Sequence, residues 1–231
     1  MKTLLVTRPS LEAKPTGDAL ELKGHRAVYA PMLLISQVSF EIPDLERSLI
    51  VTSKNSVRFG LANLIKKDRP VFAVGEQTAA AARDLGFTNI TVGPGTARKL
   101  LPILKECGIA QKRTYAHLCG NEVAYDICDA LKQCDIDAIN TVTYQTTPNN
   151  HFSPSLVEAF ELGEIDGALF YSARTATIFE ETIAGLGKHD WLRKIDAYCL
   201  SRRTADQLIG PWRTVKIASQ PTEQAVFSLF D

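Results

Sequence analysis

The sequence contains 231 residues, of which 45% are hydrophobic and 23% are charged. This composition predicts a globular protein with a sizeable core, long enough for one large domain or two small ones. Lys plus Arg and Asp plus Glu are equal at 26 each, so net charge does not favour a nucleic-acid partner, and any anionic ligand must be attracted by local positive groups.

Short apolar runs alternate with helical patterns along the whole chain. The predicted strands are 3–7, 26–38 (interrupted by Pro31), 48–53, 70–75, 89–93, 113–120, 139–146, 167–172, 195–201 and 213–219. The predicted helices are 10–24, 54–67, 76–86, 96–107, 121–134, 153–163, 173–186, 202–210 and 222–230. Strict alternation with short connections predicts parallel sheets that are covered by helices on both faces.

Two parts of the chain repeat each other. The segments around "VTSKNSV", "AVGEQTA" and "ITVGPGTA" resemble those around "FYSARTA", "CLSRRTA" and "KIASQPTE", and a strand-helix-strand unit near the N-terminus has a looser counterpart at 116–144. We therefore predict an α/β fold of two similar doubly wound parallel-sheet domains. One is discontinuous, 1–34 plus 149–231, and the other is inserted at 38–143. Connectors at about 35–37 and 144–148 would pair side by side as a two-stranded connector and act as a hinge.

Ligands of open parallel sheets bind beyond the carboxyl ends of the strands. Nearly every predicted strand ends in Ser, Thr or Gly at the start of the next helix. Each of these residues is also an ordinary helix cap, so the argument for function is collective: several helix N-termini at one edge suit a ligand with many carboxylates or phosphates. The candidate substrate-binding residues are Thr7, Arg8, Ser53, Ser56, Gly75, Thr78, Gly120, Ser172, Arg174, Ser201 and Thr204.

Signatures of cofactor and metal chemistry are missing from the sequence. It contains no G-x-G-x-x-G, no G-x-x-x-x-G-K-[ST] and no G-x-S-x-G, and its four His are not at metal-ligand spacing. The five Cys show no C-x-x-C, and the apolar run "TLLV" is too short for a signal peptide or a membrane span. We expect a cytoplasmic monomer with free thiols, no cofactor, no metal and no membrane or nucleic-acid partner.

In chain order, "VTRP", "VTSKNSV", "AVGEQTA", "LCGNE", "VTYQT" and "FYSARTA" resemble segments of the uroporphyrinogen-III synthase family. The resemblance covers the whole chain. It implies two α/β domains with an active site in the cleft between them, and a cofactor-free lyase that dehydrates and cyclises hydroxymethylbilane to uroporphyrinogen III, with inversion of ring D. The implied partner is a linear tetrapyrrole with eight carboxylates, received by transient hand-over from the preceding enzyme of the pathway.

The resemblance also implies roles for single residues. Tyr144 matches a family tyrosine proposed as the acid that assists loss of the hydroxyl group; the alternative is an aromatic residue that packs the hinge. Thr78 matches a threonine associated with the substrate. Two positions depart from the pattern: Ser201 stands where the other half has Gly75, and the loop after Gly120 lacks a common Arg.

Two other functions stay open at this point. A two-lobed binding or sensor module that converts nothing would share the same fold and hinge. A nucleotide-dependent oxidoreductase is a poorer third interpretation, because the glycine fingerprint is missing.

Overall fold

The computed structural model describes residues 1–230 and divides into two compact units. Unit 1 contains Met1–Leu34 and the chain from Thr147 onward, and unit 2 contains Ile35–Thr146. Within the described residues, the strands form two sheets, one of five strands and one of six. Each unit has hydrophobic clusters of its own on both faces of its sheet.

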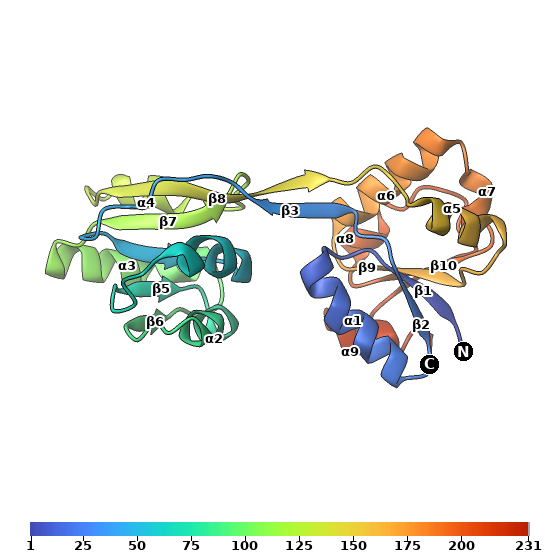
Figure 1. Ribbon diagram of the computed structural model, residues 1–231, viewed down its shortest axis with the longest axis horizontal. Coiled ribbons are helices and arrows are strands. Elements are labelled where there is room, and N and C mark those ends of the chain that lie inside the picture. Colours follow the sequence, from blue (N-terminus) through green and yellow to red (C-terminus); the bar gives the residue numbers. More distant parts are fainter. Residues whose placement is uncertain (231) are drawn as a thin grey trace. The chain divides into compact units, whose positions relative to one another are not determined.

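Unit 1 is a parallel sheet in the order β11-β10-β9-β1-β2. Its central strands are buried throughout and largely apolar, because helices cover both of their faces. Helices α1 and α9 cover one face, and α5, α6 and α7 cover the other (Figure 1). The elements are β1 (Thr3–Val6), α1 (Ser10–Leu22), β2 (Arg26–Tyr29), α5 (Pro154–Glu161), β9 (Gly167–Phe170), α6 (Ala173–Leu186), α7 (His189–Leu192), β10 (Asp196–Cys199), α8 (Arg202–Ala205), β11 (Thr214–Ile217) and α9 (Glu223–Phe227).

Unit 2 has a sheet in the order β3-β8-β7-β4-β5-β6 (Figure 1). Helices α3 and α4 cover one face, and α2 with the short helical segments η1 and η2 covers the other. The elements are β3 (Leu33–Gln37), β4 (Ser48–Val51), η1 (Ser56–Gly60), η2 (Leu61–Asn63), β5 (Val71–Ala73), α2 (Glu76–Asp84), β6 (Ile90–Val92), α3 (Ala97–Gln111), β7 (Tyr115–Gly120), α4 (Ile127–Lys132) and β8 (Ala138–Pro148).

The two units repeat one topology, which confirms the predicted pair of similar α/β domains. The order β11-β10-β9-β1-β2 in unit 1 corresponds to β6-β5-β4-β7-β8 in unit 2. Corresponding strands also share their register, because Gly167 of β9 lies beside Leu4, and Ser48 of β4 lies beside Tyr115. Residues of the two units can therefore be matched one by one from these pairs.

Strands β3 and β8 are neighbours in the sheet, and the chain passes from one unit to the other within each of them. The backbone N–H of Asn149 donates to the carbonyl of Met32 at 2.9 Å, and the N–H of Val38 donates to the carbonyl of Thr143 at 3.2 Å. Met32 and Val38 are thus bonded to Asn149 and Thr143, in the reverse order along the chain, so β3 and β8 run antiparallel.

Two predicted helices of unit 2 are largely irregular. Residues 54–67 were expected to form one helix, but they contain a π-helical turn at Ser56–Gly60 and a 3₁₀ turn at Leu61–Asn63. Residues 121–134 contain only α4, because the Asp126 carboxylate accepts the N–H groups of Cys128 and Asp129 and starts the helix there. The segment 121–126 is therefore a loop at the carboxyl end of β7.

Candidate functional site

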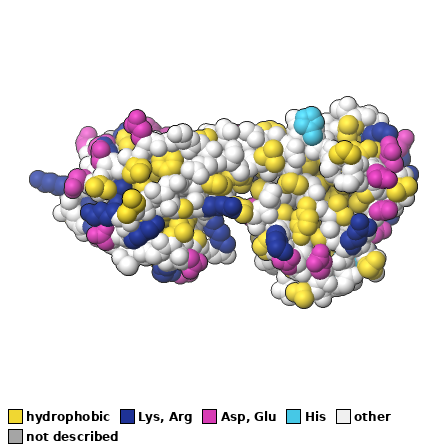
Figure 2. All heavy atoms as spheres, in the orientation of Figure 1, with side chains coloured by type: hydrophobic (Ala, Val, Ile, Leu, Met, Phe, Trp, Pro, Cys, Tyr) yellow, Lys and Arg dark blue, Asp and Glu magenta, His cyan; other side chains and the backbone are white. Residues whose placement is uncertain are grey.

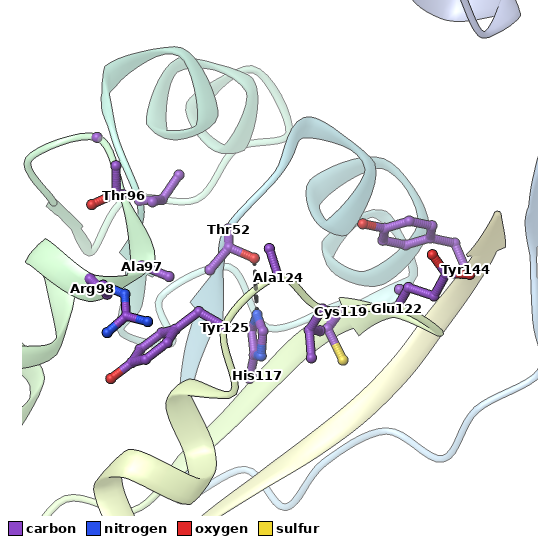
Figure 3. Close-up of a pocket in the computed structure, with 14 residues that line it drawn as sticks. Thr52, Thr96, Ala97, Arg98, His117, Cys119, Glu122, Ala124, Tyr125 and Tyr144 are labelled. Atoms are coloured by element: carbon purple, nitrogen blue, oxygen red, sulfur yellow. Dashed lines mark hydrogen bonds between the residues drawn. The ribbon is translucent and has the colours of Figure 1, made fainter. Parts of the chain in front are cut away.

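The carboxyl edge of the unit 2 sheet contains a cavity of about 530 Å³ (Figure 3). Its walls come from the ends of β4, β5, β7 and β8, from the N-terminus of α3 and from the loop 121–126. The lining residues are Thr52, Val74, Gly95, Thr96, Ala97, Arg98, His117, Cys119, Gly120, Glu122, Val123, Ala124, Tyr125 and Tyr144. Two of the residues selected from the sequence, Gly120 and Tyr144, belong to this wall.

Tyr144 is half-buried on β8, and the structure defines the surroundings of its ring. The phenol oxygen lies 3.1 Å from the Ser53 hydroxyl, and the ring packs against Phe59 at 5.9 Å between centroids. Gly120 lies beneath the ring: a Cβ atom at position 120 would be only 2.7 Å from Cε2 of Tyr144. Gly120 is thus required to make room for the tyrosine.

Ser53 and Ser56 form one turn after β4. The Ser53 hydroxyl accepts the backbone N–H of Ser56 at 3.0 Å and lies 3.1 Å from the Ser56 hydroxyl. Ser56 is fully buried, so its hydroxyl holds Ser53, which in turn contacts Tyr144. This small network orients the phenol of Tyr144.

Gly75 and Thr78 lie at the start of α2. A Cβ atom at Gly75 would be 3.2 Å from Cα of Gly95, so two loops of the site approach each other backbone to backbone. The Gly95 N–H donates to the Val74 carbonyl at 2.7 Å, which fixes this approach. Thr78 is 6% exposed, three residues after Gly75. Whether Gly75 and Thr78 contact a substrate stays a prediction.

One side of the cavity is positive. The N-terminus of α3, a helix of 15 residues, reaches the wall at Thr96, Ala97 and Arg98. The first N–H groups of a helix lack partners within the helix and carry its positive dipole end. The Arg98 guanidinium lies over the Tyr125 ring at 4.7 Å. Figure 2 shows Lys and Arg interspersed with Asp and Glu over the visible face of unit 2, so the positive charge at the cavity is local. This side suits carboxylates.

A buried histidine also lines the cavity. His117 is 1% exposed, and its Nε2 lies 3.0 Å from the Thr52 hydroxyl (Figure 3). Its Nδ1 lies 3.0 Å from Oδ1 of Asn140, whose amide donates to Asp126 at 3.1 Å. Burial lowers the pKa of His117, although the bond to Asn140 opposes this. We did not predict His117 or Thr52, because their roles depend on partners across three strands.

In unit 1, Thr7 and Arg8 follow β1, and the side chains of both already bond to other residues of the unit. The buried Thr7 hydroxyl donates to the Leu169 carbonyl at 2.6 Å. Arg8 forms an ion pair with Glu223 at 2.9 Å and lies over the Tyr171 ring at 4.5 Å. A substrate carboxylate that used Arg8 would therefore compete with Glu223.

Ser172 and Ser201 of unit 1 repeat the turn made by Ser53. Each accepts the backbone N–H of the residue three positions on, and each hydroxyl lies within 3.0 Å of that residue's hydroxyl. Thr204, the partner of Ser201, is 2% exposed, and Arg174 is half-buried in the first turn of α6. These residues lie at the carboxyl edge of the unit 1 sheet, and their contact with a substrate stays a prediction.

The place in unit 1 that corresponds to the cavity is filled. Counting from the matched registers, Tyr171 and Arg8 correspond to Thr52 and Cys119. The helix caps Thr222 and Thr96 correspond as well, and the next residues are Glu223 in unit 1 and Ala97 in unit 2. In unit 1, this place is filled by Tyr171 and by the Arg8–Glu223 ion pair. In unit 2, the smaller side chains of Thr52, Cys119 and Ala97 leave it open.

Among residues 1–230, no three His, Cys, Asp or Glu side chains lie close enough together to hold a metal ion. Over the same residues, the helices are too short or too polar to cross a membrane.

Comparisons with known proteins agree on one family. The family model described as uroporphyrinogen-III synthase HemD matches residues 14–228. The uroporphyrinogen-III synthase of Chlorobaculum parvum is 27% identical over 205 residues, which cover 79% of this chain and 80% of that protein.

Two solved structures share the fold. Uroporphyrinogen-III synthetase from Helicobacter pylori has a TM-score of 0.65 at 19% identity and covers 99% of this chain and 98% of its own. A mutant uroporphyrinogen III synthase from Thermus thermophilus has a TM-score of 0.54 at 18% identity and covers 99% and 97%. The family model spans most of the sequence, and these structures have the same two-sheet architecture. The chain therefore belongs to the uroporphyrinogen-III synthase family.

Proposed function

We propose that this protein catalyses the cyclisation of hydroxymethylbilane to uroporphyrinogen III, with loss of water and inversion of ring D. The observation that carries the proposal is the family match over residues 14–228. The open cavity at the carboxyl edge of the unit 2 sheet supports it, because the equivalent place of the sister unit is filled by side chains.

The proposed substrate is a multiply charged anion, and the site is suited to anions without a net positive charge on the protein. The N-terminus of α3 and Arg98 supply local positive charge at the cavity. We further propose that residues of both units form the substrate site: Thr7, Arg8, Ser53, Ser56, Gly75, Thr78, Gly120, Ser172, Arg174, Ser201 and Thr204. Buried hydroxyls in this set, such as Ser56, would act by orienting their neighbours.

Tyr144 is the proposed catalytic acid. A positioned tyrosine phenol can act as a general acid by donating its proton to a leaving group. The Ser56 hydroxyl can donate to Ser53, and the Ser53 hydroxyl to the Tyr144 oxygen. With that direction, the Tyr144 proton remains available for the departing hydroxyl group, which leaves as water while pyrrole nitrogen electrons form an azafulvene.

The enzyme must also control the geometry of ring closure. The azafulvene closes to the wrong isomer in solution, so the enzyme must hold the chain in the orientation that inverts ring D. Dehydration and ring closure transfer no electrons to or from an outside group. We therefore propose a cofactor-free lyase that acts as a cytoplasmic monomer, with the connectors as a hinge.

A coupled assay tests this proposal. Hydroxymethylbilane is generated in situ, the protein is added, and oxidised porphyrin isomers I and III are separated by chromatography. Isomer III in excess over a blank without protein is the expected result. Isomer I alone, with the protein folded by circular dichroism, would contradict the proposal and favour a non-enzymatic binding module.

The role of Tyr144 has its own test. Tyr144→Phe should lose much but not all of the rate of isomer III formation, by about 10²- to 10⁴-fold if the phenol is the general acid. The matched control is Tyr29→Phe, which removes an exposed phenol from unit 1. Unchanged kinetics in folded Tyr144→Phe would remove the residue from the mechanism.

A further inference from the structure

A chain of hydrogen bonds connects the cavity wall to the outside of unit 2. It runs from the Thr52 hydroxyl to His117 at 3.0 Å, from His117 to Asn140 at 3.0 Å, and from Asn140 to the Asp126 carboxylate at 3.1 Å. Its centre, His117, is 1% exposed and lines the cavity. The mechanism proposed above does not use this chain.

The direction of each hydrogen bond follows from the Asp126 end. The Oδ1 atom of Asp126 accepts the backbone N–H groups of Cys128 and Asp129, and these bonds lower the pKa of the carboxyl group. An ionised carboxylate only accepts hydrogen bonds, so Asn140 must turn its NH₂ group toward it. The Asn140 oxygen then faces His117, and the Nδ1 atom of His117 must carry a proton to donate to it.

The hydrogen-bonding role of the other ring nitrogen, Nε2 of His117, follows in the same way. Burial lowers the pKa of His117, which favours the neutral ring at neutral pH. A neutral ring with its proton on Nδ1 has a bare Nε2, which only accepts. The Thr52 hydroxyl must therefore donate its proton to His117, and only lone pairs of its oxygen remain for the cavity.

We propose that His117 is a positioning residue that fixes the Thr52 hydroxyl as a hydrogen-bond acceptor, and that Thr52 accepts a pyrrole N–H of the bound tetrapyrrole. This inference rests on the proposed function, since it names one contact of that substrate. An acceptor at Thr52 disfavours a carboxylate next to it, whereas Arg98 and the N-terminus of α3 favour one beside them. The cavity thus offers different contacts to the N–H group and to the acidic side chains of a pyrrole ring.

The tautomer of His117 is a direct test on the wild-type protein. Long-range proton–nitrogen correlation spectra of ¹⁵N-labelled protein at neutral pH should show a neutral ring at position 117, protonated on Nδ1. The His117→Gln variant identifies its signals among the four histidines of the chain. A ring protonated on Nε2, or an imidazolium, would overturn the inference whatever the activity.

Kinetics test the contact with the substrate. Thr52→Val keeps the shape of the side chain and should raise KM for isomer III formation about three- to tenfold, the effect of one lost hydrogen bond. His117→Leu should raise KM to a similar extent, because the Thr52 hydroxyl is then free to rotate. The double variant should be no worse than Thr52→Val alone, since both changes remove the same interaction.

Two further variants separate positioning from packing. His117→Gln should restore part of the loss seen in His117→Leu, because the glutamine amide oxygen can accept the Thr52 proton. Thr182→Val is the matched control: it removes a buried hydroxyl that donates to the Ile178 carbonyl in unit 1, and it should leave KM unchanged.

The outcomes distinguish the inference from the function on which it rests. A wild-type protein that forms no isomer III contradicts the proposed function, while the tautomer measurement still tests the hydrogen-bond chain. A wild-type protein that is active, combined with an unchanged KM in folded Thr52→Val or with multiplicative losses in the double variant, contradicts the role of His117 and leaves the function intact.

Discussion

Gly120→Ala should displace Tyr144 without removing its phenol. The added Cβ atom would lie 2.7 Å from Cε2, 2.8 Å from Cζ and 3.1 Å from the hydroxyl oxygen of Tyr144. Ordinary contacts between carbon atoms are about 3.5–4.0 Å, so the ring must move by about 1 Å. The half-buried ring has room to do so, whereas the backbone of β7 is held by its neighbours β4 and β8.

The displacement should reduce activity more than stability. The 3.1 Å contact between Tyr144 and Ser53 would be lost, which costs about 0.5–1.5 kcal/mol for a typical hydrogen bond. A reacting group misplaced by about 1 Å can reduce the rate about 100-fold. We therefore expect kcat for isomer III to fall about 10- to 100-fold in Gly120→Ala, with a cooperative unfolding transition retained.

The assay is the rate of isomer III formation, corrected for isomer I formed without enzyme. Gly120→Ala combined with Tyr144→Phe should be no slower than Tyr144→Phe alone, because both act through the phenol. Gly185→Ala is the control, since a Cβ atom there meets nothing within 4 Å in helix α6. Full activity in folded Gly120→Ala, or a multiplicative loss in the double variant, would refute this reasoning.

Three other predictions concern stability and thiol chemistry. Arg69→Met should lower the free energy of unfolding in urea by about 2–4 kcal/mol, because the buried guanidinium donates to three backbone carbonyls. The bond from Arg213 lowers the pKa of Asp196, so its stabilisation is fully present above about pH 4 and is lost progressively as the pH falls from there through the lowered pKa of the folded protein. In urea unfolding, the difference between Asp196→Asn and wild type should therefore be constant from pH 6 to about 4 and should shrink only below about pH 4. In thiol titration with a disulfide reagent, the half-buried Cys107 and Cys134 should react before the three buried cysteines, whose thiol pKa burial raises.

The fold was largely predictable because its signals are local and repeated. Apolar runs of three to six residues predicted the parallel strands, and Ser or Thr at their ends predicted the helix starts; Ser53, Ser172 and Ser201 do bond to the N–H group three residues on. The helix predicted at 121–134 was largely wrong. Its first part has ordinary helix propensity, but Asp126 caps the helix from within the predicted span and leaves 121–126 as a cavity-lining loop.

The site was predictable only in part. The rule that ligands bind at carboxyl strand ends places Ser53, Gly75 and Gly120 at one edge of the unit 2 sheet. The rule could not identify His117, because this residue lies inside strand β7 and no residue near it in the sequence marks it as part of a site. His117 stands out only through its bonds to Thr52, which follows β4, and to Asn140 on β8, and such contacts between neighbouring strands have no local sequence pattern.

The difference between the two repeats explains why residue type at a strand end does not by itself predict a contact. Arg8 and Cys119 occupy matching positions, yet the Arg8 charge is taken up by Glu223 and its guanidinium covers Tyr171. In unit 2, the residue after the helix cap is Ala97 instead of an acid, and the positive charge one position later, on Arg98, stacks on Tyr125 and lines the cavity.

A substitution that gives unit 2 the residue found at the matching position of unit 1 tests this difference. Ala97→Glu would place a carboxylate at the N-terminus of α3, where it competes with an anionic substrate for the same N–H groups and for Arg98. If this side of the cavity binds substrate carboxylates, the variant should remain folded and show a raised KM with little change in kcat.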